Sequence, residues 1–241
     1  MAKPPSSALF VVSAATYWTL KDGTRHPTGF WAEELVVPHG ILSDAGYEIT
    51  IATPGGVAPT PDPASLLPEF NGGDPKRVEA LTEALASIGD PLEHPAALAD
   101  VAPDESSYEV VFYPGGHGPM EDLAVDRTSG DLLTDRLDSG RRLALLCHAP
   151  AAMLAARRPN GDWPFRGYHL TAFTDAEEES GGLAAKANWL LQGRLVDNGA
   201  DFDAGEPWAE HTVHDRNLHT GQNPMSSERL ANDLVHAHAP S

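Results

Sequence analysis

Short apolar, β-branched runs alternate along this chain with longer stretches in which apolar residues recur every three or four positions. Such runs are typical of strands buried on both faces, and the longer stretches are typical of amphipathic helices. The expected strands are residues 8–15, 47–53, 108–114, 142–147 and 168–174. The expected helices are residues 32–45, 75–89, 130–139, 149–156, 183–198 and 224–236. This alternation predicts an α/β fold in which a mostly parallel sheet carries helices on both faces.

Two segments depart from this alternation. Residues 211–214 and 218–220 flank Asp215-Arg216-Asn217, a short turn that favours a C-terminal hairpin. Nine of the 21 prolines lie between Pro54 and Pro103, which favours loops and one helix packed over the sheet and not a linker. We expect a single domain over residues 1–241, in which residues 54–107 form a cap over the active site or an interface.

The only cysteine, Cys147, lies where a predicted strand turns into a Pro- and Ala-rich helical pattern. A side chain on such a tight turn projects from the sheet, and the amino end of the following helix favours a thiolate. His148 is an adjacent candidate base. A lone cysteine is more often a small buried apolar residue, but the turn and the neighbouring histidine favour a nucleophile here.

Composition restricts the compartment and the partners. A single cysteine excludes an internal disulfide, and residues 1–20 contain no basic segment followed by a long apolar stretch. We therefore expect a cytoplasmic protein without a membrane span. The formal net charge of -19 repels phosphate backbones and anionic lipids, so nucleic acids and membranes are not expected partners.

Polar motifs follow three of the predicted strands. They are Cys147-His148, the loop Gly115-Gly116-His117-Gly118 and residues 175–179. Ligands of open parallel sheets bind beyond the carboxyl ends of the strands, so these motifs could share one pocket. The glycine loop lacks the spacing of a phosphate-binding loop. Its backbone N–H groups could instead point at a developing oxyanion, and an ordinary turn is the alternative.

An acidic run follows the last predicted strand. We expect Asp175 to be the N-cap of a helix whose first turn contains Glu177, Glu178 and Glu179. One of these three glutamates could turn inward and orient the ring of His148. Position in the sequence alone does not choose among them.

A second pair of carboxylates lies on the first long helix. Glu33 and Glu34 are consecutive, so they lie about 100° apart on its surface and cannot both face the sheet. One could enter the pocket, where burial would raise its pKa and let it share a proton with a thiolate. Two solvent-facing glutamates are the alternative.

The histidines near the C-terminus do not predict a metal site. His211, His214 and His219 have no matching pattern of cysteines or carboxylates. Asn223-Pro224 is typical of the start of the last helix.

In their order and spacing, these motifs resemble the ThiJ/PfpI superfamily, with its class I glutamine amidotransferase-like fold. Within it they are most similar to the heat-shock chaperone-like glyoxalase III branch. The segments that carry the resemblance are residues 28–38, 51–56, 112–122, 144–150, 173–179 and 220–224. The fold implied by the resemblance is a flavodoxin-like sandwich.

The resemblance also implies roles for individual residues. Cys147 corresponds to the nucleophile and His148 to its adjacent histidine, Glu34 to the pocket glutamate, and Glu178 to the acid that orients the histidine. Glu33 is then the solvated neighbour. Gly115, Gly116, His117 and Ala149 are the candidate oxyanion and substrate-binding residues. Ala149 and Ala172 replace glycines of many relatives, which should narrow the pocket.

The implied activity is a cofactor-independent conversion of small reactive carbonyls, with methylglyoxal to lactate as the type reaction of a glyoxalase III-like lyase, or a related deglycase activity. Some relatives hold zinc with two histidines and one carboxylate, but this site has no convincing counterpart in the sequence, so we expect no metal. The resemblance implies a homodimer. Two other functions stay open at this point. One is amide or peptide hydrolysis by the same nucleophile, and the other is a stress-response holdase chaperone or a sensor of cysteine oxidation.

Overall fold

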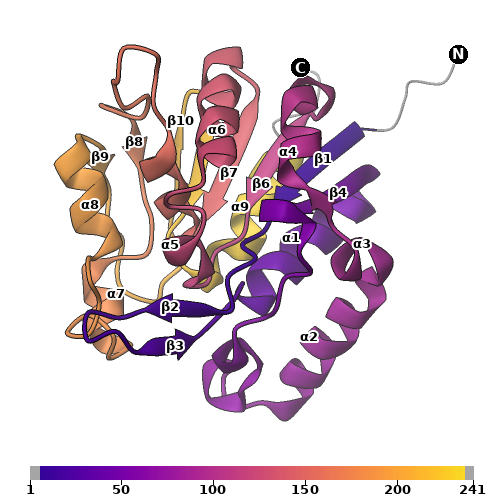
Figure 1. Ribbon diagram of the computed structural model, residues 1–241. Coiled ribbons are helices and arrows are strands. Elements are labelled where there is room, and N and C mark those ends of the chain that lie inside the picture. Colours follow the sequence, from indigo (N-terminus) through magenta and orange to yellow (C-terminus); the bar gives the residue numbers. More distant parts are fainter. Residues whose placement is uncertain (1–5, 237–241) are drawn as a thin grey trace, which may run out of the picture.

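A seven-stranded sheet forms the centre of the molecule (Figure 1). The computed structural model describes residues 6–236. The strands of this sheet are Ser6–Val11 (β1), Tyr47–Thr53 (β4), Ala96–Ala97 (β5), Val110–Tyr113 (β6), Arg142–Leu146 (β7), Thr212–Asp215 (β10) and Leu218–Gly221 (β11). Their order is β10-β11-β7-β6-β1-β4-β5, and only the β10–β11 pair is antiparallel. The predicted parallel sheet and C-terminal hairpin are therefore confirmed.

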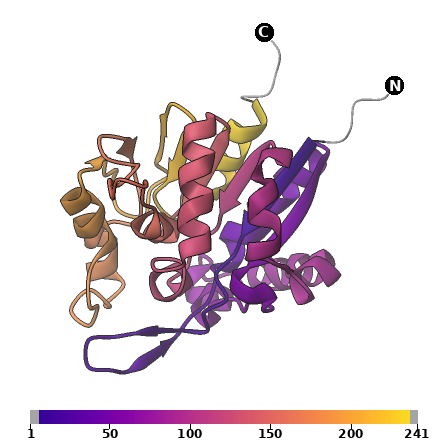
Figure 2. The same ribbon diagram turned by 45° about the horizontal axis from the view of Figure 1, so that its top comes forward.

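Two short strand pairs lie outside this sheet. Tyr17–Thr19 (β2) pairs with Arg25–Pro27 (β3), and His169–Leu170 (β8) pairs with Asp201–Phe202 (β9). Figure 2 shows the β2–β3 hairpin extending away from the central sheet. No apolar run marks this hairpin in the sequence.

Helices cover both faces of the sheet. The α-helices are Ala32–Asp44 (α1), Pro75–Ile88 (α2), Asp90–Glu93 (α3), Leu98–Val101 (α4), Gly118–Glu121 (α5), Arg127–Ser139 (α6), Asp175–Ser180 (α7), Leu191–Asn198 (α8) and Ser227–His236 (α9). Short 3₁₀ helices span Pro54–Gly56, Pro63–Leu66, Pro68–Phe70, Ala102–Ser107, Ala149–Ala155 and Pro224–Ser226. Helices α1 and α9 pack together on one face, and α4 and α6 lie on the other (Figure 2). Among residues 6–236, no helix has the length and apolar character needed to cross a membrane.

Successive side chains of the central strands point to opposite faces of the sheet, and both faces are buried under apolar side chains. Leu9 of β1 belongs to the apolar cluster that contains Leu133 of α6, whereas the next residue, Phe10, belongs to the cluster that contains Leu35 of α1. Because side chains alternate along a strand, a strand covered on both faces needs an uninterrupted apolar run. This requirement is why the apolar runs predicted the central strands.

Three predicted elements differ from the structure. Of residues 168–174, only β8 is a strand, and it lies outside the central sheet. The backbone beyond it is bonded elsewhere: Thr171 N–H donates to the hydroxyl of Thr220, and Phe173 N–H donates to the carbonyl of Cys147. Residues 149–155 form a 3₁₀ helix, and residues 183–198 are helical only over α8.

The proline-rich residues 54–107 form turns and helices beside the start of α1. The backbone N–H of Phe30 donates to Thr60 O, and Asp62 N–H donates back to Phe30 O. The Thr28 hydroxyl also donates to the Asp62 carboxylate at 2.6 Å. A Cβ at Gly29 would lie 1.9 Å from Thr60 O, so only glycine fits where the two segments meet.

We predict that Gly29→Ala destabilises the protein by about 1–3 kcal/mol, because the added methyl group overlaps a backbone carbonyl. Gly40→Ala is the matched control, since Gly40 lies within α1 and nothing lies within 4 Å of its missing Cβ. It should raise the free energy of unfolding by about 0.5–1 kcal/mol through helix propensity. Urea unfolding measures both changes, and a Gly29→Ala protein as stable as the parent would contradict the close contact.

Candidate active site

Cys147 directly follows β7 and has a left-handed backbone conformation with φ 59°. This conformation costs a residue other than glycine on the order of 1–3 kcal/mol and persists only where the surroundings enforce it. Here Cys147 N–H donates to Gly221 O of β11 at 2.8 Å, and its carbonyl accepts from Phe173 N–H at 2.9 Å. The sharp turn predicted at Cys147 is therefore present, and it is held from both sides.

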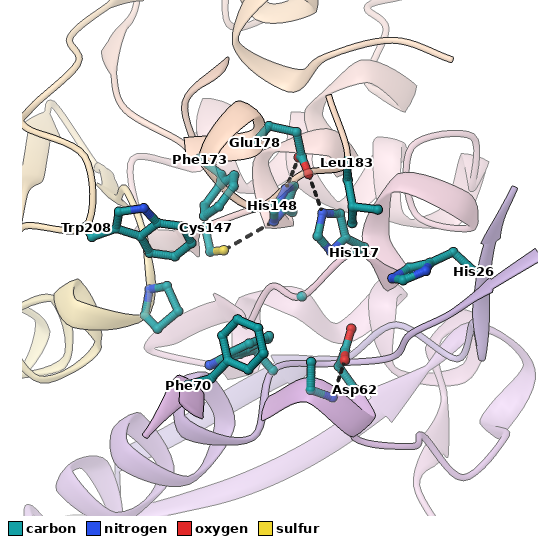
Figure 3. Close-up of a pocket in the computed structure, with 15 residues that line it drawn as sticks. His26, Asp62, Phe70, His117, Cys147, His148, Phe173, Glu178, Leu183 and Trp208 are labelled. Atoms are coloured by element: carbon teal, nitrogen blue, oxygen red, sulfur yellow. Dashed lines mark hydrogen bonds and ion pairs between the residues drawn. The ribbon is translucent and has the colours of Figure 1, made fainter. Parts of the chain in front are cut away.

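Cys147, His148 and Glu178 form a continuous chain of polar contacts (Figure 3). The Sγ atom of Cys147 lies 3.3 Å from Nδ1 of His148, and Nε2 of His148 lies 2.9 Å from Oε2 of Glu178. All three side chains are buried. A nucleophile, a base and an acid that orients the base are the groups needed for covalent catalysis by a thiol.

Burial and neighbouring charges set the protonation states of His148 and Glu178. Burial, together with the neighbouring His117, lowers the pKa of His148 to about 4, although Glu178 acts in the opposite direction. Burial alone would raise the pKa of Glu178, but hydrogen bonds from His117 and His148 outweigh it and hold this pKa below its ordinary value. At neutral pH the ring of His148 is therefore neutral and donates through Nε2 to an ionised Glu178. Its Nδ1 then remains free to accept the proton of the thiol.

Glu34 reaches the Cys147 sulfur from the first turn of α1, although it is not among the described residues that line the cavity. It is fully buried, and its Oε2 accepts a hydrogen bond from Gly115 N–H at 2.8 Å. Its Oε1 has no hydrogen-bond partner among residues 6–236. Burial raises the pKa of Glu34 to about 8, and the Cys147 thiol and Gly115 N–H offset only part of this rise. At neutral pH Glu34 is thus a protonated carboxyl beside the sulfur.

The Cys147 thiol does not gain the strong stabilisation as a thiolate that the helix terminus suggested. Burial raises its pKa, and so does the nearby Glu34 carboxyl, whereas a hydrogen bond from Gly116 N–H acts in the opposite direction. The following helix is a short 3₁₀ helix, which adds little opposing charge. The thiol therefore needs His148 to take its proton.

Glu33 faces away from the pocket, but it is not freely solvated as predicted. It forms an ion pair with Arg77 of α2, and only 12% of its side chain is exposed. Helix α2, within the proline-rich residues 54–107, therefore covers Glu33.

The glycine loop contributes differently at each position. Gly115 N–H is bonded to Glu34, so it is not available to an oxyanion. A Cβ at Gly115 would lie 2.5 Å from Leu146 O, which excludes larger residues. Gly116 has φ 89° and lines the cavity, with its N–H near the sulfur. Ala149 is fully buried and is not among the described residues that line the cavity.

His117 adds a second histidine to the contacts of Glu178. Its Nε2 lies 2.9 Å from Oε1 of Glu178, so this carboxylate bridges two histidines. The other side of the His117 ring stacks on Trp18 of the β2–β3 hairpin, with ring centroids 4.9 Å apart. Potential ligand atoms of His117, His148 and Glu178 lie within 4.8 Å of one another, so these three residues could hold a divalent cation.

The helix that presents Glu178 begins one residue earlier than predicted. Thr174, and not Asp175, is the N-cap, because its hydroxyl accepts from Glu177 N–H and the Glu177 carboxylate accepts from Thr174 N–H. The same Glu177 carboxylate accepts from the side chain of Asn223 at 2.8 Å. Glu177 and Glu178 are buried, whereas Glu179 is exposed.

A cavity of about 200 Å³ opens in front of Cys147. Its wall includes four aromatic residues, Trp31, Phe70, Phe173 and Trp208. Phe70 and Trp208 lie outside every motif recognised in the sequence. Asp62 and Phe70, both in the proline-rich residues 54–107, also line the cavity. The signal available for Trp208 is structural, because φ 61° is rare for so bulky a residue.

The chain resembles known proteins over nearly its whole length. The family model described as "DJ-1/PfpI family" matches residues 27–237 of this chain. Protein/nucleic acid deglycase HchA from Staphylococcus aureus (strain JH9) is 28% identical over 242 residues, which cover 95% of this chain and 80% of the relative. Glyoxalase III from Candida albicans is 25% identical, with a TM-score of 0.74 over 96% of this chain and 97% of that one. Rapid Encystment Protein 24 kDa from Francisella tularensis shares the fold, with a TM-score of 0.79 at 22% identity over 96% and 98% of the two chains. This chain therefore belongs to the DJ-1/PfpI family, in its glyoxalase III-like branch.

Proposed function

We propose that this protein is a cysteine-dependent enzyme that converts small 2-oxoaldehydes to 2-hydroxy acids without a cofactor, with methylglyoxal to lactate as the type reaction. The observation that carries the proposal is the position of the Cys147 sulfur, which has a neutral base on one side and a protonated carboxyl on the other. The names of the glyoxalase III and deglycase relatives support the same class of chemistry.

The first step is addition of the thiol to the aldehyde. His148 Nδ1, 3.3 Å from the sulfur, accepts the thiol proton while the new C–S bond forms, and Glu178 stabilises the resulting imidazolium. The Gly116 N–H and the carboxyl of Glu34 lie where they can donate to the developing oxyanion. The product is a hemithioacetal that keeps the neighbouring ketone.

The second step moves hydrogen between the two carbonyl carbons. Glu34, which became a carboxylate when it gave its proton to the oxyanion, removes the proton from the former aldehyde carbon while the His148 imidazolium protonates the ketone oxygen, which gives an enediol. Glu34 then returns its proton to the neighbouring carbon, and His148 takes the proton of the other hydroxyl. The result is a thioester of the 2-hydroxy acid. Water hydrolyses this thioester, which releases the acid and restores the thiol, so that the net change is the addition of one water molecule.

A deglycase reaction would reach the same hemithioacetal, because the Cys147 thiol can replace the amine or thiol that the carbonyl had modified, and the displaced group leaves with the thiol proton. The Staphylococcus aureus relatives are named for action on proteins and nucleic acids. For this chain we propose a small carbonyl substrate, since a net charge of -19 opposes binding to a phosphate backbone. Amide hydrolysis is the second candidate, favoured by the Cys147–His148–Glu178 geometry, and release of ammonia from simple amides would reveal it.

We predict that Cys147→Ala lowers kcat/KM for methylglyoxal by at least about 10³-fold, because the covalent intermediate cannot form. Lactate formation by the purified protein is the measurement, and a circular dichroism spectrum like that of the parent shows that the variant is folded. If lactate is still produced at the parental rate, the thiol mechanism is wrong.

Glu34→Gln should lower kcat by about 10²–10⁴-fold, since the amide fills the same space but cannot exchange a proton. Glu33→Gln is its matched control, because the neighbouring carboxylate pairs with Arg77 outside the cavity. It should keep kcat within about twofold of the parent. Equal activity of the two variants would remove Glu34 from the proton path.

The pH dependence of kcat/KM should be bell-shaped. On the acidic side activity falls as His148, with a pKa of about 4, becomes protonated and can no longer accept the thiol proton. On the alkaline side it falls as Glu34, with a pKa of about 8, loses its proton and places a negative charge beside the sulfur. A profile of initial rates measures both limbs. Activity that keeps rising above the pKa of Glu34 would contradict the role of its protonated form.

A further inference from the structure

Two aromatic side chains at the mouth of the cavity remain exposed to solvent. Phe70 is 47% exposed and Trp208 is 40% exposed, and both line the cavity in front of Cys147. Figure 3 shows the two rings reaching this cavity from different segments of the chain. Among the described residues, two further exposed apolar side chains are close in sequence to lining residues: Leu67 precedes Phe70, and Met225 follows Pro224. The opening of the site is therefore apolar, although exposing such surface to water is unfavourable.

Trp208 is held in its exposed position by specific contacts. Its backbone has φ 61°, and its backbone N–H donates to the carboxylate of Glu177 at 2.8 Å. The indole N–H donates to the Ser180 hydroxyl at 2.8 Å, and the ring meets Phe173 edge to face, with centroids 5.4 Å apart. A strained backbone that holds a large ring partly in water is typical of a functional position and not of a core residue.

Phe70 is held in place by a contact with Trp31 and by hydrogen bonds within its own turn. Its ring meets Trp31 edge to face, with centroids 5.8 Å apart. The neighbouring Asn71 is buried, and its amide group donates to the carbonyls of Ser65 and Leu67. These bonds close the turn that carries Phe70. Both rings are thus placed before any ligand arrives, which lowers the entropy lost on binding.

The charges in the cavity disfavour an anionic ligand. None of the described residues that line it is a lysine or an arginine, whereas Asp62 and Glu178 present carboxylates. The pKa of His26, at the same wall, is lowered mainly by burial. A carboxylate on the substrate would therefore meet like charge without a fixed cation to pair with.

We propose that this site selects 2-oxoaldehydes with an aromatic or similarly large apolar substituent, which Phe70 and Trp208 contact while Cys147 attacks the aldehyde. This inference rests on the proposed function and names its substrate class. For phenylglyoxal the thiol adds to the aldehyde carbon, the hydrogen of that carbon is replaced on the ketone carbon, and hydrolysis of the thioester gives mandelate. The balance is one phenylglyoxal and one water to one mandelic acid, with no outside oxidant or reductant.

The kinetic test compares phenylglyoxal, methylglyoxal and 4-carboxyphenylglyoxal, an anionic 2-oxoaldehyde, as substrates of the whole protein, Phe70→Ala and Trp208→Gly. Glycine is chosen at position 208 because it adopts positive φ without strain. The control is Val125→Ala, which removes another exposed apolar side chain, 78% exposed, that does not line the cavity.

We expect the parent protein to prefer phenylglyoxal over methylglyoxal by about tenfold or more in kcat/KM, and to use 4-carboxyphenylglyoxal less well than phenylglyoxal. Each rim variant should lower kcat/KM for phenylglyoxal about tenfold more than it lowers the value for methylglyoxal, mainly through KM. Val125→Ala should match the parent. Turnover of methylglyoxal without a preference for phenylglyoxal, or a preference that survives both rim variants, would overturn the inference while leaving the proposed function intact.

Binding of an unreactive probe separates this inference from the proposed function. Acetophenone, acetone and benzoate are titrated into Cys147→Ala by calorimetry, with and without the rim substitutions. Acetophenone should bind at least about tenfold more tightly than the other two and lose this advantage in the rim variants. If no oxoaldehyde is turned over but this pattern holds, the proposed function fails and the apolar subsite stands. Equal binding of the three probes overturns the subsite, and so does a rim substitution that alters only the oligomeric state in size-exclusion chromatography.

Discussion

The left-handed backbone at Cys147 is the constraint on which the site depends. In an extended continuation of β7 the side chain of residue 147 would join Leu143 and Leu145 in the apolar layer on the α6 side of the sheet. The turn instead aims the thiol beyond the end of the sheet, where α1 supplies Glu34 and the next residue supplies His148. Two hydrogen bonds, from Phe173 and to Gly221, hold this unfavourable conformation. The parallel pairing of β11 with β7 is what brings Gly221 to that place.

A dry environment then distributes the protons. Burial favours the neutral forms of Glu34, Cys147 and His148, and Glu178 is the exception because two histidines donate to it. Of these four ionisable groups only Glu178 is charged, and His148 separates it from the sulfur. A negative charge that forms on the sulfur or on a substrate oxygen therefore meets donors and not a second anion.

The parts of this architecture that depend on local chemistry could be predicted from the sequence. The central strands were recognisable because they are covered on both faces, and Cys147-His148 was recognisable because the two residues are adjacent at a strand end. Helix geometry alone left Glu33 and Glu34 equivalent, and only the family resemblance chose Glu34, since the partner of Glu33 is Arg77 in a distant helix. Residues 168–174 were predicted as a strand because burial and strand formation produce the same apolar pattern. The roles of Phe70 and Trp208 depend on how two long loops fold back to the sheet edge, and no periodicity encodes that path.

Ligand binding at the apolar opening of the cavity affects the protonation of the ionisable groups beside Cys147. The raised pKa of Glu34 results from its burial, and the Cys147 sulfur beside it lines a cavity that water can enter. An apolar group seated between Phe70 and Trp208 displaces that water. The hydrogen bond between His148 and Glu178 then lies in a medium of lower dielectric constant, where it is stronger. Binding energy gained at the rim is thereby linked to the protonation state at the sulfur, so a ligand that fills the mouth also prepares the groups that attack it.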